Sequence, residues 1–573
     1  MGFITEIFKK TSCPFSKEIS NVNSLLFLAI TAFYCTSPLF ILQGLPNAHD
    51  MVFHLFQAGQ FDKALHEGFF YPRWLPDSNN GYGSATFIFY SPASYYFVSM
   101  INLFAPSLTI AMITAIWSGF FLSGITMFMA AMKIFGRAGS LLAAVTYQIL
   151  PFHLWDLYLR GTLAELFSFI WLPLIILFMH NMFESKSKIA AAGLSVSYAG
   201  LILTHLVSGF IFTFVAGVYL IYNYFLRDKK TLLKAMLSLL LGLGLSSFYL
   251  IPAIAERKFV QIEYITNCTV GDYRKNFLFS LDNVGAILES FYLKLNMGAA
   301  LEAALFLFIV FIIRENRHRL SDKSHQNLFI FLFISAFLLT VPLSKPVWSV
   351  VPGFPTLQFP WRWMPVMELS LSLLIGFIFS LDDRPRFKSN SLKKRAVMYL
   401  FAVFSIVSLL TISRSNILSG EFLAEISSPD KIRDLMEPPI EYTPVWVKDI
   451  GKIMSEKEPV KVSALSGMAK ADVVEWKSEK RVIHINSLTP ASLRISTFYY
   501  PGWKARLDGK DIPINIERNS GAMVIESPAG EHVIELRFAD TPARRYMKII
   551  SLVSFLIVTA MVLHFFYKRY RNG

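Results

Sequence analysis

Long apolar runs recur along most of the chain and decide what it can fold into. A run of about 18 or more apolar residues is typical of a helix that crosses a bilayer, because a helix satisfies its own backbone hydrogen bonds inside lipid. Of the 573 residues, 54% are hydrophobic and only 16% are charged, whereas about 25% are charged in an ordinary soluble domain. The sequence therefore predicts a polytopic α-helical membrane protein.

The first apolar run, residues 24–42, is too long for the core of a signal peptide, and no Ala-x-Ala site follows it. We expect it to be an uncleaved first span. The three cysteines, Cys13, Cys35 and Cys268, lie far apart and form neither metal-ligand spacing nor a disulfide framework. The net charge of +14 would suggest nucleic acid in a soluble chain, but here the excess lies in short loops between apolar runs.

Basic loops predict the orientation of the chain, because lysine and arginine accumulate on the cytoplasmic side. The clear basic segments are residues 227–230, 314–319, 384–395 and 568–571, and Lys9, Lys10 and Lys17 add to them near the N-terminus. Placing these segments inside puts both termini in the cytoplasm. Four segments then lie outside, namely residues 44–85, 152–161, 254–297 and about 414–545.

One apolar segment must fail to cross if this orientation holds. Runs lie at residues 86–104, 108–131 and 139–151, and three crossings would invert every later basic loop. We expect residues 86–104 to lie at the membrane interface, because this run is rich in Tyr and Ser and contains Pro92. The remaining runs predict about 12 or 13 spanning helices.

The pattern changes after about residue 414, from long apolar runs to short alternating segments. Five such segments, at residues 481–485, 492–498, 512–516, 523–526 and 532–538, are separated by turn signals such as Asp508-Gly509. They predict a β-sandwich. The expected organisation is a transmembrane domain at 1–413, an extracytoplasmic β-sandwich domain at 414–545, and a last transmembrane helix with a basic tail at 546–573.

Ionisable residues gather in the first two external loops, where they are costly near lipid and therefore candidates for function. The first loop has His49, Asp50 and His54 directly after the first span, and Arg73 lies further on between Pro72 and Trp74. A solvated interfacial loop, with aromatic rings at the level of the headgroups, is the alternative interpretation.

The second loop holds Asp156 and Arg160, which can pair four residues apart on a helix, and then Glu165. A structural ion pair at a helix end is the alternative interpretation. His205, at the outer end of a later span, is equally compatible with a ligand contact and with a core histidine bonded to a carbonyl. Arg362 lies between aromatic residues, where its planar fork suits a phosphate, although snorkelling to headgroups would also explain it.

These residues resemble one known group of proteins. An Asp after the first span, followed by an acidic residue in the second external loop, resembles the GT-C superfamily of membrane glycosyltransferases. The resemblance is closer to a bacterial branch, the YfhO-like proteins and the family labelled "membrane protein, 6-pyruvoyl-tetrahydropterin synthase-related", although no soluble pterin-synthase domain is visible. It is carried by HDMVFHLF (49–56), YPRWLPDSNNGYG (71–83), FYSPASYY (89–96), DLYLRGTLAE (156–165), THL (204–206), PWRW (360–363), FYYPGWKARLDGK (498–510) and SPAGEHVIELRF (527–538).

The resemblance implies a transferase in the bacterial inner (cytoplasmic) membrane. It would move a sugar from a polyprenyl-phosphate donor to an envelope glycan, lipid or protein at the outer face, with Asp50 as the base. A single Asp156 stands where an Asp-x-Asp would suggest metal, so a divalent cation, Mg²⁺ or Mn²⁺, is left open. The predicted catalytic residues are Asp50 and Asp156, and the predicted substrate-binding residues are His49, His54, Arg73, Trp74, Asp77, Tyr82, Tyr90, Arg160, Glu165, His205 and Arg362.

Two other functions remain open from the sequence. A transporter or flippase for lipid-linked sugars also uses ionisable residues within the membrane, but at mid-membrane and with internal repeats that this chain lacks. A non-catalytic envelope assembly protein would explain the β domain, but not the carboxylates in two separate loops. No nucleic-acid partner is expected.

Overall fold

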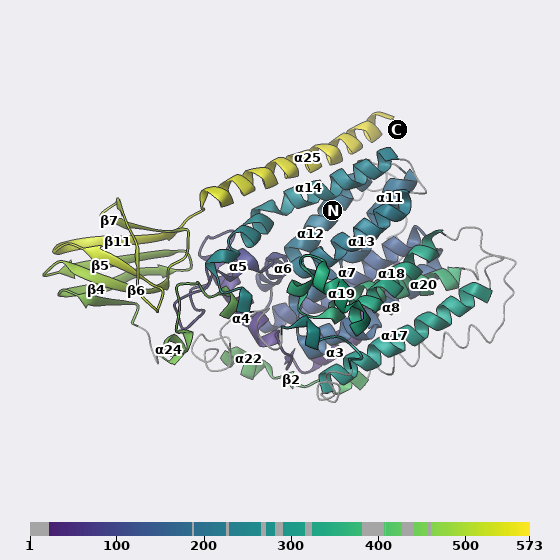
Figure 1. Ribbon diagram of the computed structural model, residues 1–573, viewed down its shortest axis with the longest axis horizontal. Coiled ribbons are helices and arrows are strands. Elements are labelled where there is room, and N and C mark those ends of the chain that lie inside the picture. The colour runs from purple at the N-terminus through teal and green to yellow at the C-terminus, as the bar shows by residue number, and fades with distance from the viewer. Residues whose placement is uncertain are drawn as a thin grey trace.

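The computed structural model describes residues 22–185, 188–224, 229–264, 271–280, 290–315, 324–380, 410–426, 440–455 and 460–572, together with residues 406 and 408. Figure 1 shows a large helical region with two β-sheets at one end and the last helix, α25 (Pro542–Asn572), running along one side. Most of the basic segments used for the orientation, at residues 9–17, 316–319 and 384–395 and at Arg227, fall outside the described residues.

In the described part of the chain, eight helices are long and apolar enough to cross a membrane, and one bent pair would make a ninth. The expected polytopic helical class is therefore confirmed, although the described residues hold fewer spans than the 12 or 13 predicted. The eight candidate spans are Val22–Ile41, Leu108–Met132, Leu163–Glu184, Leu206–Tyr224, Lys229–Phe259, Phe291–Glu315, Pro360–Phe379 and Pro542–Lys568, and the bent pair is His325–Thr340 with Pro342–Val350.

The remaining helices are shorter or lie within these spans. Residues 86–104 form α5 (Thr86–Phe89) and α6 (Ala93–Asn102) on either side of Pro92, and neither is a candidate span. Other helices that enter the description are α3 (Val22–Ile41), α4 (Met51–His66), α7 (Leu108–Met132), α8 (Arg137–Ile149), α9 (Pro151–Trp155), α10 (Leu163–Ser168), α11 (Trp171–Ser185), α12 (Lys188–Thr204), α13 (Leu206–Tyr224), α14 (Lys229–Ala255), α17 (Ser290–Glu315), α18 (Ser324–Thr340), α19 (Lys345–Val350), α20 (Met364–Ser380), α22 (Gly420–Ile426) and α24 (Ile450–Ser455).

Two antiparallel sheets form the β region. One has the strand order β3-β6-β10-β9 and the other β4-β5-β11-β7-β8. Alternate residues face inward, as in β5, where Ile483 and Ile485 are buried, and they share one apolar cluster with Leu493 and Ile525 of the opposite sheet. The strands are β3 (Val462–Ser466), β4 (Ala469–Lys477), β5 (Lys480–Ser487), β6 (Ala491–Phe498), β7 (Trp503–Leu507), β8 (Lys510–Ile512), β9 (Asn515–Ile516), β10 (Ala522–Ser527) and β11 (Gly530–Phe538).

This arrangement confirms the predicted β region, and the five predicted strand segments all carry strands. The sheets begin only at Val462, however, and the boundaries 414 and 545 remain predictions. A separate two-stranded pair joins the chain after the first span, β1 (Leu45–Pro46), to β2 (Ile417–Leu418). Gly44 is required beside this pair, because a Cβ there would lie 1.8 Å from the carbonyl oxygen of Leu418.

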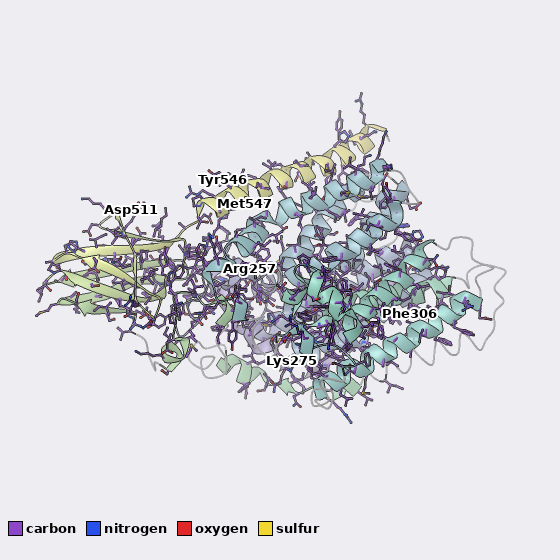
Figure 2. All side chains as sticks on the ribbon, in the orientation of Figure 1. Arg257, Lys275, Phe306, Asp511, Tyr546 and Met547 are labelled. Carbon is purple, nitrogen blue, oxygen red and sulfur yellow. The ribbon has the colours of Figure 1, made fainter. Side chains whose placement is uncertain are left out.

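The last helix packs on α14 through small residues. Ser247 and Ser551 bond to each other at 2.9 Å, and Ser247 also donates to the carbonyl of Met547 at 3.0 Å. Figure 2 labels Met547 at the end of α25 nearest the sheets. Beyond it, Arg544 bonds Glu256 at 2.6 Å, so a buried ion pair joins the start of α25 to the residue that follows α14.

Candidate active site

The first and second external loops meet through their backbones. The N–H of Asp50 donates to the carbonyl of Arg160 at 2.8 Å, and the N–H of His49 donates to that of Leu159 at 3.4 Å. Gly161 makes this approach possible, because its φ is +69° and a Cβ there would lie 2.8 Å from the backbone nitrogen of Met51. Residues far apart in the sequence therefore form one junction directly beside Asp50.

Arg160 is the centre of a buried charge cluster. One of its nitrogens, Nη1, donates to Asp156 Oδ1 at 2.5 Å and to Glu165 Oε2 at 2.6 Å. Asp156 and Arg160 are the first and last residues of one π-helical turn, so their side chains can meet. The guanidinium also lies 4.5 Å from the ring centre of Trp361. The predicted Asp156–Arg160 pair is thus present, with Glu165 as a second carboxylate.

The carboxyl groups at this junction differ from ordinary surface acids. Burial raises the pKa of Asp156 well above its usual value, and the charge of Glu165 raises it further. Burial also raises the pKa of Asp50, against the opposing effects of Arg160 and Arg362. Asp50 nevertheless remains accessible to solvent. Protein atoms pack around its carboxyl group on the other sides. Such a group can both meet a substrate and take up a proton.

Arg362 is a second cation near the same acids, but its bonding differs. It interacts electrostatically with Glu165 and Asp50. Its Nη1 donates to the carbonyl of Leu357 at 2.8 Å, whereas its Nε is buried without a hydrogen-bond partner. Among the described residues no carboxylate forms an ion pair with it. The guanidinium of Arg362 therefore keeps donors for a ligand.

Neutral histidines and aromatic rings border this group of charges. His54 bonds the hydroxyl of Tyr95 at 2.7 Å through Nδ1, and its Nε2 is buried without a partner. Burial lowers the pKa of His54 to about 3, helped by His205 and Arg160, and burial lowers the pKa of His205 to about 4. Both imidazoles are therefore neutral at neutral pH. The ring of Tyr90 lies 5.9 Å from His54.

His49 faces another part of the chain. Its ring lies 5.1 Å from that of Phe291, at the start of α17, and its surface is exposed. The structure thus brings together the first loop, the second loop and the start of α17. The expected site residues found in this group are His49, Asp50, His54, Tyr90, Asp156, Arg160, Glu165, His205 and Arg362.

Four expected site residues lie elsewhere: Arg73, Trp74 and Tyr82 contact the β region, and Asp77 pairs within the first loop. Arg73 is bound by Glu479, at 2.8 Å, and by Asp540. Trp74 packs against Trp503 with ring centres 5.5 Å apart. Their partners neutralise or cover these side chains, so we leave them out of the candidate site. Asp77 pairs with Lys63 at 3.0 Å, and Tyr82 packs on Phe498.

Comparison with known proteins identifies the class of this chain. Residues 87–418 match the model of a family described as "6-pyruvoyl-tetrahydropterin synthase related domain; membrane protein". The chain belongs to this family. The resemblance that the sequence motifs carried is therefore confirmed, and the matched residues include most of the candidate site. The first loop with Asp50 precedes the matched range.

One relative is distantly similar to this chain. An uncharacterized protein of Lactococcus lactis subsp. cremoris is 25% identical over 266 residues, which are 44% of this chain and 42% of that protein. The chain thus spans less than half the length of this relative.

Solved structures give weaker likenesses. The oligosaccharyltransferase of Archaeoglobus fulgidus has a TM-score of 0.47 at 12% identity, over 74% of this chain and 60% of its own. The arabinofuranosyltransferase AftD from Mycobacteria has a TM-score of 0.41 at 15% identity, over 71% of this chain and 27% of its own. Both scores lie below 0.5, so neither likeness assigns a role to this chain.

Sequence reasoning missed one acid at the junction. Glu441 lies in a short 3₁₀ turn, Ile440–Tyr442, and its charge interacts with that of Asp50. Burial raises the pKa of Glu441. The neighbouring Tyr442 stacks on Phe89 at 6.0 Å, which holds this turn near the first loop. No motif marks Glu441, because it lies nearly 400 residues after Asp50.

A second missed feature is a pair of acids inside the helical region. Glu302 of α17 and Glu368 of α20 are fully buried, and their side chains meet. Glu368 also accepts the N–H of Phe152 at 2.7 Å, in the first turn of α9, directly before Asp156. Both carboxylate oxygens of Glu302 are buried without a hydrogen-bond partner among the described residues. The two can bond only if one of them carries a proton. In the sequence, the only sign of this pair is that Glu302 and Glu368 each interrupt a long apolar segment.

Proposed function

We propose that this protein is a membrane glycosyltransferase that moves a sugar from a polyprenyl-phosphate donor to an envelope acceptor at the extracytoplasmic face. The observation that supports it most is the junction of the two loops, which sets an exposed Asp50 against the buried Arg160 cluster. Transfer from a lipid phosphate requires a base and a cation, and Asp50 and the nearby Arg362, whose Nε has no partner, are proposed to supply them.

In the proposed reaction an acceptor hydroxyl attacks the anomeric carbon of the sugar. The new carbon–oxygen bond forms as the bond from that carbon to the phosphate oxygen breaks, and polyprenyl phosphate leaves with the electron pair. Asp50 takes the proton of the hydroxyl. Its raised pKa favours this step, because a base is most effective when its pKa lies nearer the working pH.

Arg362 is proposed to hold the donor phosphate. Its Nε has no partner, and its guanidinium lies 5.0 Å from the ring of Phe359, which orients it. Two N–H groups of one guanidinium can bind two phosphate oxygens and stabilise the charge that develops on the leaving group. Arg160 is already bound by two carboxylates. Its proposed role is to orient Asp156 and Glu165, and it does not bind the donor phosphate.

The acids near Asp50 do not fit a divalent cation such as Mg²⁺ or Mn²⁺. Such an ion takes about six oxygen ligands. Here Asp156 Oδ1 and Glu165 Oε2 both bind Arg160, and only Asp156 Oδ2 is buried without a partner. A divalent ion there would also face the guanidinium charge. We therefore derive no step through a metal.

Replacement of Asp50 by Asn tests the proposed base. The change keeps the size of the side chain but removes the proton acceptor, so transfer should fall about 10²–10⁴-fold. The assay follows release of polyprenyl phosphate from a panel of polyprenyl-phosphate sugars by the purified full-length protein. Asp62→Asn is the matched control, because Asp62 lies in the same loop but bonds Asn102 at 3.0 Å. Equal rates for both variants would contradict the proposal.

The pH dependence gives a second test of the same residue. In the wild type, kcat/KM should rise with pH as Asp50 loses its proton, and the midpoint should lie above the ordinary aspartate value of about 3.9. The rise should disappear in whatever activity remains in Asp50→Asn. An unchanged profile in the variant would assign the acid limb to another group.

A transporter or flippase of lipid-linked sugars is the second candidate, and the buried pair of Glu302 and Glu368 favours it. Acids inside a membrane bundle are used to carry protons through transporters. Proteoliposomes distinguish the two functions. Movement of an intact lipid-linked sugar across the bilayer, without release of polyprenyl phosphate, would favour transport, whereas release of the phosphate favours the transferase.

The proposed orientation places the loops and the β region outside the cell and both termini in the cytoplasm. A reporter fused after Arg395 should then report a cytoplasmic site, and one inserted near Asn519 an external site. An external result at Arg395 would put Asp50 on the cytoplasmic side, where the proposed outer-face reaction could not occur.

A further inference from the structure

Three side chains with metal-binding atoms gather far from the candidate active site. They are His180 and Glu184 of α11 and His325 at the start of α18. One ligand atom from each lies within 4.8 Å of the others, and His180 Nδ1 is 3.1 Å from His325 Nε2. In the described part of the chain this is the only group of at least three such residues that could hold an ion.

Local structure explains why these atoms converge. His180 and Glu184 are four residues apart, so they project from one face of α11. His325 lies in the first turn of α18, and its ring centre is 4.9 Å from that of His180. His180 is buried whereas Glu184 is exposed, which leaves a route for an ion from the solvent.

The position of this cluster separates it from the candidate active site. Glu165 and Glu184 lie near opposite ends of the candidate span Leu163–Glu184. Glu184 follows Glu165 by 19 positions, which corresponds to about 28 Å of helix, close to the thickness of the hydrocarbon core of a bilayer. The cluster therefore lies at the membrane face opposite to the Arg160 cluster.

We propose that His180, Glu184 and His325 bind a divalent transition metal of the zinc class, and that the ion links α11 to α18. Two imidazoles and one carboxylate suit zinc, whereas magnesium and calcium prefer oxygen ligands. In a tetrahedral site with Zn–N distances of 2.0–2.1 Å, the two nitrogens lie about 3.3 Å apart. The observed 3.1 Å needs only a small adjustment. A water molecule would complete the fourth position.

Zinc binding to the purified full-length protein tests this proposal. The protein should carry no polyhistidine tag and be stripped with a chelator before titration with Zn²⁺ alone in a calorimeter. We expect one equivalent to bind and Tm to rise. His180→Ala and His325→Ala should each weaken binding at least about 100-fold, since even the loss of an outer partner costs 10–100-fold. His564→Ala, an exposed histidine of α25, should leave binding unchanged.

Two further measurements keep the test decisive if an alanine variant fails to fold. Glu184→Gln changes an exposed side chain, so it should fold normally and still weaken binding. Substitution of the wild-type protein with Co²⁺ should give the visible absorption of a tetrahedral site, and this absorption should be lost in Glu184→Gln. Sub-stoichiometric zinc binding, or equal affinity in His325→Ala and His564→Ala, would overturn the site. Neither result would bear on the proposed transferase activity.

Discussion

Two groups of buried acids in the helical region meet the same electrostatic problem in different ways. Asp156 and Glu165 share the guanidinium of Arg160, whereas Glu302 and Glu368 have no cation bound to them among the described residues. A buried carboxylate needs a counter-charge or a proton, because its removal from water costs several kcal/mol. The first group therefore keeps an ion pair, and we expect the second to hold a proton. The ion pair holds the side chains of the Arg160 cluster in place, whereas a proton shared by Glu302 and Glu368 can be released to another group.

The largest effect is expected from Arg160→Leu, which removes the cation from the first group. Two buried carboxyls would then lie side by side without compensation, and the free energy of unfolding should fall by about 3–5 kcal/mol. Thermal unfolding in detergent measures this change. Arg160→Lys is the control, since it keeps the charge but contacts the two carboxylates less well, and it should lie between the wild type and Leu. Equal stability of all three proteins would show that the ion pair does not hold the loop.

A smaller effect is expected from Asp156→Asn. The amide oxygen can still accept the bond from Arg160, but the charge on the acceptor is lost. A hydrogen bond to a charged group contributes about 1.5–3 kcal/mol, so the loss of stability should not exceed that range. Transfer should fall as well, because the variant loosens the turn that bonds Asp50. A variant as unstable as Arg160→Leu would mean that Asp156 supports more than this pair.

Arg362→Lys tests the arginine that forms no ion pair among the described residues, in contrast to Arg160. The variant keeps the charge but cannot grip two phosphate oxygens at once. We expect donor affinity to fall about tenfold, which is about 1.4 kcal/mol, while stability changes by less than about 1 kcal/mol. Donor binding is measured by titration with the polyprenyl-phosphate sugar that supports transfer. Unchanged affinity would favour simple snorkelling to the headgroups.

The smallest effect is expected from Glu302→Gln in the second group. If Glu302 and Glu368 already share a proton, an amide can replace the protonated carboxyl and donate to its partner, so stability should change by less than about 1 kcal/mol. Chemical or thermal unfolding near neutral pH measures it. A large gain in stability would show that both acids are ionised in the wild type, which would remove the contrast with the Arg160 cluster.

The class of fold could be read from the sequence because it depends on period and length alone. Apolar runs long enough to cross lipid predicted the helices, and alternation from residue 481 onward predicted strands such as β5 and β11. The number of spans was harder to predict, since residues 86–104 and 139–151 have similar apolarity but form short helices broken by Pro92 and Pro151. Strands β3, β4 and β7 were missed, because exposed strands such as β4 alternate only weakly.

By itself the sequence determined the membrane class, the β region and a set of ionisable residues near the first two loops. It could also predict the pair of Asp156 and Arg160, because a spacing of four residues places two side chains on one helical face. Only the tertiary structure decided which distant residues join them. In the structure, the N–H of Asp50 donates to the carbonyl of Arg160, and Arg73 forms an ion pair with Glu479. The side chains of Glu302 and Glu368 lie close together. Contacts between segments hundreds of residues apart depend on how whole helices pack, and no local period or spacing encodes that packing.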